Sequence, residues 1–307
     1  RTLMYDLYNL DWNDQILNHF NISRSSLPTV KPSLSIFARE TEIFGDVPIS
    51  AVLGDQQASL FGHNGIFKGS IKNTYGTGCF LLCNTGTDIV KSTSGLLTTV
   101  AYQLENEPPV YALEGSVAIA GASIQWLRDN LGIINTSSDV EKLSLEVKDN
   151  GDVYFVPAFS GLFSPHWDPT ARGTIVGLTR YSNKSHIARA VLESVAFQTN
   201  DVLSALSKDL KQDQLVLSVD GGMVNNNLLM QYQSDISNIQ VQAPKLNEIT
   251  AYGAALASYV FIKKIDLKSI PSSNKRDQTW SPNMSEQKRE NYLISWNKAI
   301  EKAKNWL

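Results

Sequence analysis

The sequence predicts an α/β fold, and three observations support this prediction. In the second half of the chain, short apolar runs rich in β-branched residues alternate with segments of helical periodicity. Between residues 70 and 113, strand-like runs follow one another, separated by Gly, Asn and Thr turns. Hydrophobic residues make up 42% of the 307 residues, which is enough for one large domain or two modest ones.

The N-terminal half predicts mainly short strands. A helix is expected near residues 14–20, among connecting loops. The apolar run 49–53 ends in Gly54-Asp55, as a buried strand would, and residues 56–63 have a helical texture. Further strands are expected at residues 70–74, 79–84, 95–103 and 110–113. We interpret them as a meander or a series of hairpins.

The C-terminal half predicts longer helices between strands. Helical periodicity is expected at residues 124–133, 140–147, 185–210 and 249–261. A further helix is expected to begin at about residue 226. Strands are expected at residues 153–156, 215–219 and 239–242, with a loop rich in Gly, Pro and aromatic residues at 157–173. A polar break at 269–283 precedes an amphipathic helix over 286–307.

The charge and hydropathy patterns exclude several classes of partner. Lys and Arg number 27 against 30 Asp and Glu, and no long basic run is present. We therefore expect neither nucleic acid nor an anionic membrane surface as a partner. No stretch approaches the ~18 consecutive apolar residues of a membrane helix, and the first residues lack a signal-peptide pattern. The expected location is the cytoplasm, without membrane insertion.

The cysteine and histidine residues predict no metal centre. Cys79 and Cys83 are too few for a disulfide framework or a structural zinc site, and we expect both to be reduced in or near a strand. The four histidines are scattered without metal-ligand spacing. A nucleophile elbow, a P-loop and a dinucleotide fingerprint are all absent from the sequence.

Asp55 is the first candidate for chemistry. A carboxylate after a strand and before a helix lies where ligands bind in open α/β sheets, close to a helix N-terminus. This position suits a general base. Taken alone, an Asp here more often caps the helix.

Gly76-Thr77-Gly78 lies between two strand-like runs and predicts a tight hairpin. Backbone N–H groups of such a turn can form an anion-binding nest, to which Thr77 would add a hydroxyl donor. This arrangement suits a phosphate. Taken alone, a hairpin turn built from glycines is far commoner than a phosphate loop.

Two glycines are each followed, four residues later, by an amide side chain: Gly121 by Gln125 and Gly222 by Asn226. Glycine permits close approach of backbone to a ligand, and the amide lies one helical turn further on. Such pairs could flank a purine and its ribose. Taken singly, each pair is more commonly an ordinary helix start.

In this order, these segments resemble the FGGY family of carbohydrate kinases, and within it the members that phosphorylate glycerol. The resemblance extends over residues 1 to about 261 and rests on the motifs GDQQ (54–57), NTYGTGCF (73–80), GLLTT (95–99), YALEG (111–115), AGASIQWLRD (120–129), WDP with ARG (167–173), GTIVGL (173–178) running on to HI (186–187) and AVLE (190–193), and VDGG (219–222).

The resemblance implies an actin-like ATPase fold of the ribonuclease-H-like type, a mixed sheet flanked by helices. Residues 1–47 would be the end of the N-terminal kinase domain, and 48–265 the C-terminal, nucleotide-binding domain. Residues 266–307 would form a linker and a C-terminal helix. Because the sequence at Arg1 resembles the interior of a domain, we expect an upstream portion to be missing.

The resemblance also implies an activity, the ATP-dependent phosphorylation of glycerol to sn-glycerol 3-phosphate in glycerol catabolism. Asp55 would be the general base, Gln56 would bind a second hydroxyl and Phe80 would line the glycerol pocket. The residues implied for the nucleotide are Thr77 and Gly78 at its phosphates, Gly121 and Gln125 along it, and Gly222 and Asn226 at its adenosine end.

The same resemblance implies Mg²⁺ on the phosphates, ATP or ADP and glycerol as ligands, and a homo-oligomer, either a dimer or a tetramer. Mitochondrial association would apply only to a eukaryotic member. Two alternatives stay open: another sugar or polyol kinase of the family, such as one for xylulose, or a non-catalytic nucleotide-binding protein of the same fold. Phe80 and the GLLTT run favour glycerol. Residues 41–47 are shorter than the segment that binds fructose 1,6-bisphosphate in some bacterial members, so that regulation is not expected.

Overall fold

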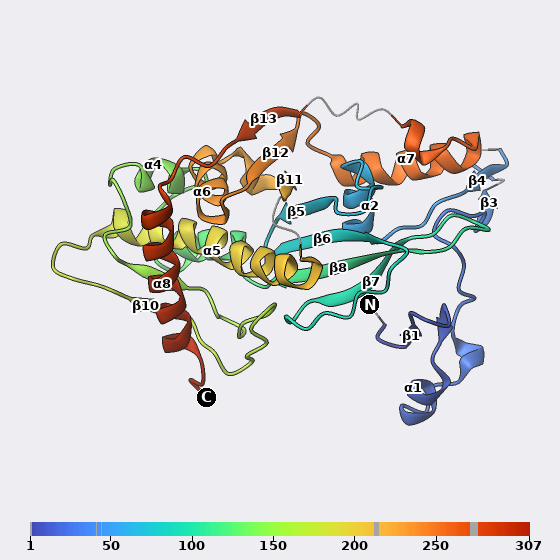
Figure 1. Ribbon diagram of the computed structural model, residues 1–307, viewed down its shortest axis with the longest axis horizontal. Helices are drawn as coiled ribbons and strands as arrows, with labels where there is room; N and C mark the ends of the chain where they lie inside the picture. The colour runs from blue at the N-terminus through green and yellow to red at the C-terminus, as the bar shows by residue number, and fades with distance from the viewer. Residues whose placement is uncertain (1, 41, 44, 212–214, 271–275) are drawn as a thin grey trace.

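The computed structural model describes residues 2–40, 42–43, 45–211, 215–270 and 276–307. Its centre is a seven-stranded mixed sheet in the order β13-β12-β11-β5-β6-β8-β7, with helices on both faces (Figure 1). Strand β11 runs parallel to β5 and β12, and the other neighbours are antiparallel. The strands are β5 (Ile71–Tyr75), β6 (Cys79–Gly86), β7 (Leu97–Tyr102), β8 (Val110–Val117), β11 (Val216–Asp220), β12 (Gln240–Pro244) and β13 (Arg276–Trp280). The α/β prediction is confirmed.

Alternation along the central strands divides the core between the two faces of the sheet. In β6, Leu81 and Cys83 belong to one buried cluster and Leu82 to the other, because successive side chains of a strand point to opposite faces. The larger cluster includes residues of α3 (Gly121–Asp129), α4 (Asp139–Ser144), α5 (Lys184–Leu210), α6 (Asn227–Ser237) and α8 (Glu286–Ala303). The smaller one is covered by α2 (Asp55–Gly62) and α7 (Ile249–Lys263).

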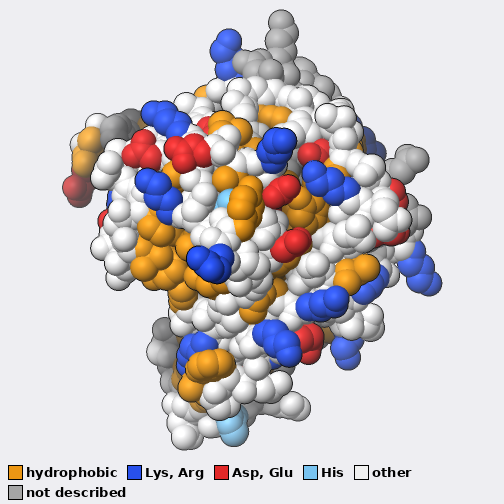
Figure 2. Space-filling model, turned by 90° about the vertical axis from the view of Figure 1, so that its left-hand side faces the viewer, with side chains coloured by type: hydrophobic (Ala, Val, Ile, Leu, Met, Phe, Trp, Pro, Cys, Tyr) orange, Lys and Arg blue, Asp and Glu red, His pale blue; other side chains and the backbone are white. Residues whose placement is uncertain are grey.

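The larger cluster joins the C-terminal helix to the sheet. Phe197 of α5 and Trp296 of α8 stack with ring centroids 5.0 Å apart, and the Trp296 indole donates to Asp201 at 2.9 Å. Both rings are fully buried. Figure 2 views this end of the molecule, where hydrophobic side chains alternate with charges of both signs. The predicted C-terminal helix is confirmed, and it ends at Ala303.

Helices α2 and α7 lie unusually close together, and two glycines make this possible. A Cβ on Gly253 would lie 1.8 Å from the Ala58 carbonyl oxygen, and one on Gly62 would lie 2.3 Å from the Ile249 carbonyl oxygen. Neither position can hold a larger side chain unless the helices separate. The position of α2, which begins at Asp55, therefore depends on α7.

Of the two predicted arrangements, the series of hairpins is confirmed, since β5 pairs with β6 and β7 with β8, whereas the simple meander is wrong in its strand order. The strands themselves are where the sequence places them, but β8 lies between β6 and β7. Strand β8 is buried along nearly its whole length, whereas β7 is partly exposed. A strand that is buried on both faces lies inside a sheet, which leaves the edge to β7.

The expected strand at residues 49–53 is also wrong. Strand β4 (Val47–Ile49) pairs only with β3 (Ala38–Glu40) and ends before the apolar run does. The N–H of Val52 donates to the Ser33 carbonyl outside any strand ladder, and the Val52 side chain is 52% exposed. The apolar composition of residues 49–53 therefore does not mark a buried strand.

The N-terminal part extends away from the body of the molecule (Figure 1). It contains the predicted helix, α1 (Asp14–His19), after the strand pair β1 (Tyr5–Asp6) and β2 (Asp11–Trp12), and the 3₁₀ turn η1 (Arg24–Ser26). Within this part, the indole nitrogen of Trp12 donates a hydrogen bond to the Pro28 carbonyl oxygen at 2.9 Å. None of the helices in the described ranges is long and apolar enough to cross a membrane.

Several short elements were not predicted, among them β10 (Thr174–Val176), β13 and η3 (Leu267–Ser269). The loop 157–173 is confirmed between β9 (Tyr154–Val156) and β10, which pair with each other. Strand β13 falls in the expected polar break, because an edge strand bonded on one side needs no apolar run. The 3₁₀ turn η3 precedes it. Residues 271–275 of that break lie outside the described ranges.

The two cysteines lie in or beside the core, as predicted. Cys79 and Cys83 are both free and buried in β6. Burial raises the pKa of each thiol to about 12. Because the thiolate is the reactive form, neither side chain is suited to nucleophilic chemistry.

One buried carboxyl group makes the stability of the fold depend on pH. Glu193 of α5 is 2% exposed, and its Oε1 accepts a hydrogen bond from Arg189 Nε at 2.7 Å. Burial raises the pKa of Glu193 from 4.5 to about 7, against the opposing effect of the Arg189 charge. Between these two values, the folded protein holds a proton that the unfolded chain has released.

We therefore expect Glu193 to lower the free energy of unfolding as pH rises from about 4.5 to about 7, by up to about 3 kcal/mol. Glu193→Gln keeps the size of the side chain and removes its titration, so the variant should lack this part of the pH slope. Chemical denaturation of both proteins at several pH values between 5 and 8 measures the difference. A variant with an unchanged slope would contradict the assignment.

Candidate functional site

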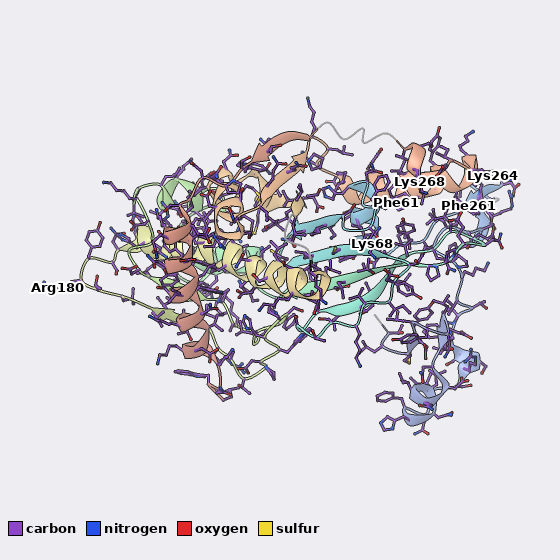
Figure 3. The ribbon with its side chains drawn as sticks, in the orientation of Figure 1. Phe61, Lys68, Arg180, Phe261, Lys264 and Lys268 are labelled. Carbon is purple, nitrogen blue, oxygen red and sulfur yellow. The ribbon has the colours of Figure 1, made fainter. Side chains whose placement is uncertain are left out.

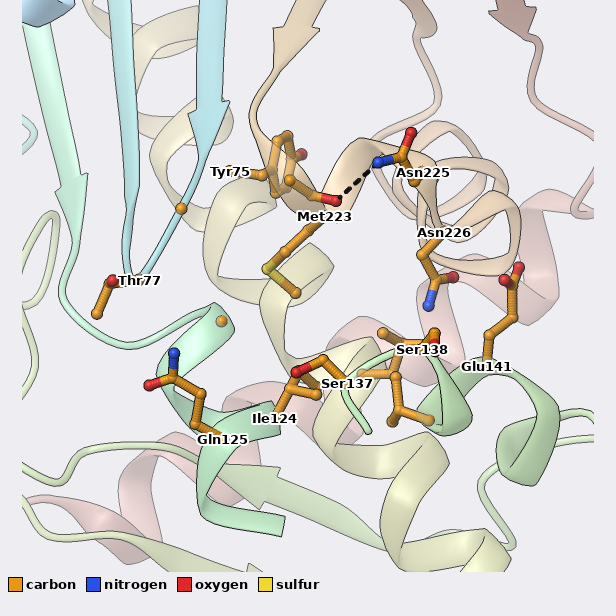
Figure 4. A pocket seen from close by; sticks show the side chains of 15 residues that line it. Tyr75, Thr77, Ile124, Gln125, Ser137, Ser138, Glu141, Met223, Asn225 and Asn226 are labelled. Atoms are coloured by element: carbon orange, nitrogen blue, oxygen red, sulfur yellow. Dashed lines mark hydrogen bonds between the residues drawn. The ribbon is translucent and has the colours of Figure 1, made fainter. Parts of the chain in front are cut away.

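A cavity of about 430 Å³ lies where the turn between β5 and β6 meets α3, α5 and the turn after β11 (Figure 4). This volume falls within the range of small-ligand pockets. Its lining residues are Tyr75, Gly76, Thr77, Gly121, Ile124, Gln125, Ser137, Ser138, Val140, Glu141, Leu192, Gly222, Met223, Asn225 and Asn226. Five of the six residues predicted for the nucleotide are among them; the sixth, Gly78, lies in the same turn.

The turn between β5 and β6 is bonded directly to the start of α3. The N–H of Gly121 donates to the Gly76 carbonyl at 3.0 Å, and that of Ala122 donates to the Thr77 carbonyl at 3.1 Å. A Cβ on Gly121 would lie 2.6 Å from the Gly76 oxygen, and one on Gly78 would lie 2.3 Å from the Val117 oxygen. Glycine is needed at both positions for this close approach. The turn and the helix therefore form one wall of the cavity.

The opposite wall is the turn that follows β11. Gly221 has φ +96°, a conformation that favours glycine, and a Cβ there would lie 2.4 Å from the Tyr75 oxygen. The 3₁₀ turn η2 (Gly222–Asn225) follows, and Asn226 caps α6 by accepting a hydrogen bond from Leu229 N at 2.8 Å. Its amide nitrogen points towards the cavity (Figure 4).

Sequence reasoning did not assign to the nucleotide ten of the 15 residues that line the cavity, and six of them show why. Ser137 and Ser138 precede α4, Glu141 lies in it, and Leu192 lies in α5. Met223 and Asn225 lie in η2, within the turn that was singled out for its glycine. The serines and Glu141 come from a segment that the motifs did not mark, so only tertiary packing brings them here.

The residues predicted for the substrate lie on the other face of the sheet. Thr74 pairs with Phe80 and Lys72 with Leu82, and paired residues share a face. Leu82 belongs to the cluster under α2 and α7, so the side chains of Lys72, Thr74 and Phe80 face α2 as well. The glycine turn that joins β5 to β6 is therefore the place where the two predicted sets of residues meet.

Asp55 is exposed at the first position of α2. Gly54 holds the N-cap position, so Asp55 is not the N-cap residue, which was the alternative reading. The Asp55 Oδ1 accepts a hydrogen bond from the Gln56 N–H at 2.8 Å, and Oδ2 accepts one from the Gln56 amide nitrogen at 3.3 Å. An exposed carboxylate with a fixed orientation can accept a proton from a bound hydroxyl.

Behind Asp55 lies a buried polar network that the motifs did not indicate. Asp220, at the end of β11, accepts hydrogen bonds at 2.7 Å from both His63 Nε2 and the Ser59 hydroxyl. Burial opposes its charge, but hydrogen bonding and the charges of His63 and Lys72 outweigh it and lower the pKa of Asp220. The network fixes α2 to β5 and β11 through side chains.

Two of the other cavities in the described part of the chain are larger than the first. One, of about 520 Å³, shares Gly222 and Asn225 with the first and reaches Asp220 and the start of α7. The other, of about 780 Å³, lies at the C-terminal end of α7, where Figure 3 shows Phe261, Lys264 and Lys268. It contains none of the residues predicted for substrate or nucleotide.

The sheet, the helices on its two faces and the cavity beside the β5–β6 turn define a domain of the actin-like ATPase fold. Residues 71–260 match the model of the C-terminal domain of the FGGY family of carbohydrate kinases, and residues 1–62 match the model of its N-terminal domain. The chain belongs to the FGGY family of carbohydrate kinases.

Several relatives are similar along the whole chain. The glycerol kinases of Clavibacter michiganensis and Chloroflexus aggregans are 49% and 50% identical to it, over 312 and 308 residues. The structure of Plasmodium falciparum glycerol kinase with ADP superposes with a TM-score of 0.90 at 39% identity, over 99% of this chain and 62% of that one. A xylulose kinase from Lactobacillus acidophilus, 24% identical with a TM-score of 0.83, shares the fold. The chain spans 61–62% of the length of these glycerol kinases.

Proposed function

We propose that the protein is an ATP-dependent glycerol kinase, which transfers the γ-phosphoryl group of ATP to glycerol and yields sn-glycerol 3-phosphate and ADP. The observation that carries this proposal is the similarity to glycerol kinases, 49–50% identity along the entire chain. The exposed Asp55 carboxylate supports it, because the reaction needs a base beside the attacking hydroxyl.

Phosphoryl transfer depends mainly on positioning and charge stabilisation, and the described residues supply parts of both. Asp55 takes the proton of the glycerol hydroxyl that attacks the phosphorus. Gln56 binds a second hydroxyl, and the Phe80 ring lines the carbon side of the pocket. Since an uncharged triol offers little else to recognise, these contacts set the orientation of glycerol.

The nucleotide occupies the cavity between the β5–β6 turn and η2. Thr77 and Gly78 hold its phosphates, and Gly121 and Gln125 contact it along the α3 wall. Gly222 and Asn226 contact the adenosine end, where the glycine lets the backbone approach the ligand. The placement of five of these six residues around one cavity supports the proposal.

Mg²⁺ is implied by the family and fits this arrangement. Within the described residues, no group of three or more His, Cys, Asp or Glu side chains could hold a metal ion. Mg²⁺ is commonly bound by one or two carboxylates together with substrate phosphates, so Asp55 and the nucleotide would suffice. The ion would neutralise charge on the phosphates. A homo-oligomer and a cytoplasmic location are also proposed, on the family resemblance.

The test is glycerol-dependent release of ADP by the gene product extended upstream to its initiator Met, with this chain in parallel. We expect activity in the extended protein, and xylulose in place of glycerol should give none. Activity with another polyol but not with glycerol would move the proposal to a different member of the family. Nucleotide binding without turnover on any polyol would favour a non-catalytic role.

A further inference from the structure

Lys72 is a fully buried cation that the proposed reaction does not use. It is the second residue of β5 and is 0% exposed. An ammonium group is costly to bury unless acceptors surround it. Its Nζ donates to Gln56 Oε1, to the Thr74 hydroxyl at 2.9 Å and to the Phe80 main-chain carbonyl at 3.2 Å.

These contacts connect Lys72 to the proposed base. An ammonium group can only donate hydrogen bonds, so the Gln56 atom that faces Lys72 must be the amide oxygen. The amide nitrogen of Gln56 then faces outward, where it donates to Asp55 Oδ2 at 3.3 Å. The Lys72 ammonium and the Asp55 carboxylate thus favour the same orientation of the amide, and removing the cation removes one of these two contacts.

Buried carboxylates share this face of the sheet with Lys72: Glu114 on β8, and Asp220 on the neighbouring β11, whose charge Lys72 stabilises and whose hydrogen bonds come from His63 and Ser59. A purely structural role is therefore the main rival explanation: Lys72 could serve as the counter-ion of Asp220. In that role, the contact between Lys72 and the Gln56 amide would have no effect on the glycerol site. The two roles predict different kinetic effects.

We propose that Lys72 is a positioning residue for the glycerol site, because it fixes the Gln56 amide with its nitrogen towards Asp55 and the substrate hydroxyl. This inference rests on the proposed glycerol kinase activity. Lys72 touches neither of the substrates in this account. It acts on the glycerol site through Gln56 alone.

The first test is Lys72→Met in the extended gene product. We expect the KM for glycerol to rise about tenfold or more, the effect of losing a hydrogen bond to a charged group. The Kd for ADP should change less than about twofold, because Lys72 does not line the nucleotide cavity. A role as counter-ion only would lower stability and leave the glycerol KM unchanged, which would overturn the proposal.

A double-mutant cycle separates positioning from a general disturbance. If Lys72 acts through Gln56, then Lys72→Met should add nothing to the glycerol KM of Gln56→Ala. A double variant whose glycerol KM rises by the product of the two single effects would contradict the proposal. Lys68→Met is the matched control, since Lys68 is an exposed lysine paired with Asp88, and it should leave all constants unchanged.

If Lys72→Met no longer binds ADP, Lys72→Gln is tested in its place, because glutamine keeps a hydrogen-bond donor at this position. The shorter, neutral amide should raise the glycerol KM at least about threefold, and a value within twofold of wild type would overturn the proposal. Wild-type protein without glycerol-dependent ADP release would instead refute the proposed function. The two failures are thus distinguishable.

Discussion

Asp55→Asn is expected to lower glycerol-dependent ADP release by a factor of about 10² to 10⁴, the usual contribution of a general base. The amide has the shape of the carboxylate, and its oxygen can still accept the hydrogen bond from the Gln56 N–H. It cannot take a proton from the substrate. The loss should therefore appear in kcat, measured by coupled ADP detection in the extended gene product.

Nucleotide binding provides the control for this variant. Asp55 is not among the residues of the nucleotide cavity, so the Kd for ADP should stay within about twofold of wild type. Asp88→Asn removes an exposed carboxylate that pairs with Lys68 and should leave turnover unchanged. Near-normal turnover in Asp55→Asn would refute the assignment of the base.

Gly253→Ala is expected to lower the free energy of unfolding by about 3 kcal/mol, the upper end of the usual cost of overpacking. The added methyl group would meet the backbone of α2, 1.8 Å from the Ala58 oxygen, where no flexible side chain can yield. Helices α2 and α7 would have to separate. Chemical denaturation measures the loss.

The same variant tests how α2 is positioned. Because Asp55 and Gln56 begin that helix, we expect glycerol turnover in the surviving folded protein to fall as well. Ala254→Ser, at the exposed neighbouring position of α7, is the matched control and should stay within about 0.5 kcal/mol of wild type. Equal stability of Gly253→Ala and wild type would contradict the close packing.

Much of the secondary structure could be predicted because its signals are local. The 27-residue helix α5 and the strands β5 and β6 are close to their predicted bounds, since periodicity lies within each segment. The errors fall where pairing decides. The run 49–53 has the composition of a strand, but among the described residues only its first residue, Ile49, has a strand partner, whereas β13 has a partner without the composition.

The candidate site was predicted only as far as its motifs reach. The glycine turns and the amides four residues after two of the glycines could be named, and five of the six nucleotide candidates line one cavity. Ser138 and Glu141 carry no such signal, because their segment meets the cavity only in the folded chain. Lys72 looked like an ordinary strand residue, and its contact with Gln56 joins positions 16 apart.

The sequence by itself determined the α/β class and the membership of the family that its motifs indicate, and it named the residues that we propose for the chemistry. Tertiary structure alone decided the strand order, the contact between α2 and α7 at Gly253, and the network that joins Asp55 to Lys72. The reason is physical: propensity and periodicity act over a few neighbouring residues. Burial of a cation and contact between two backbones depend on segments that only folding brings together.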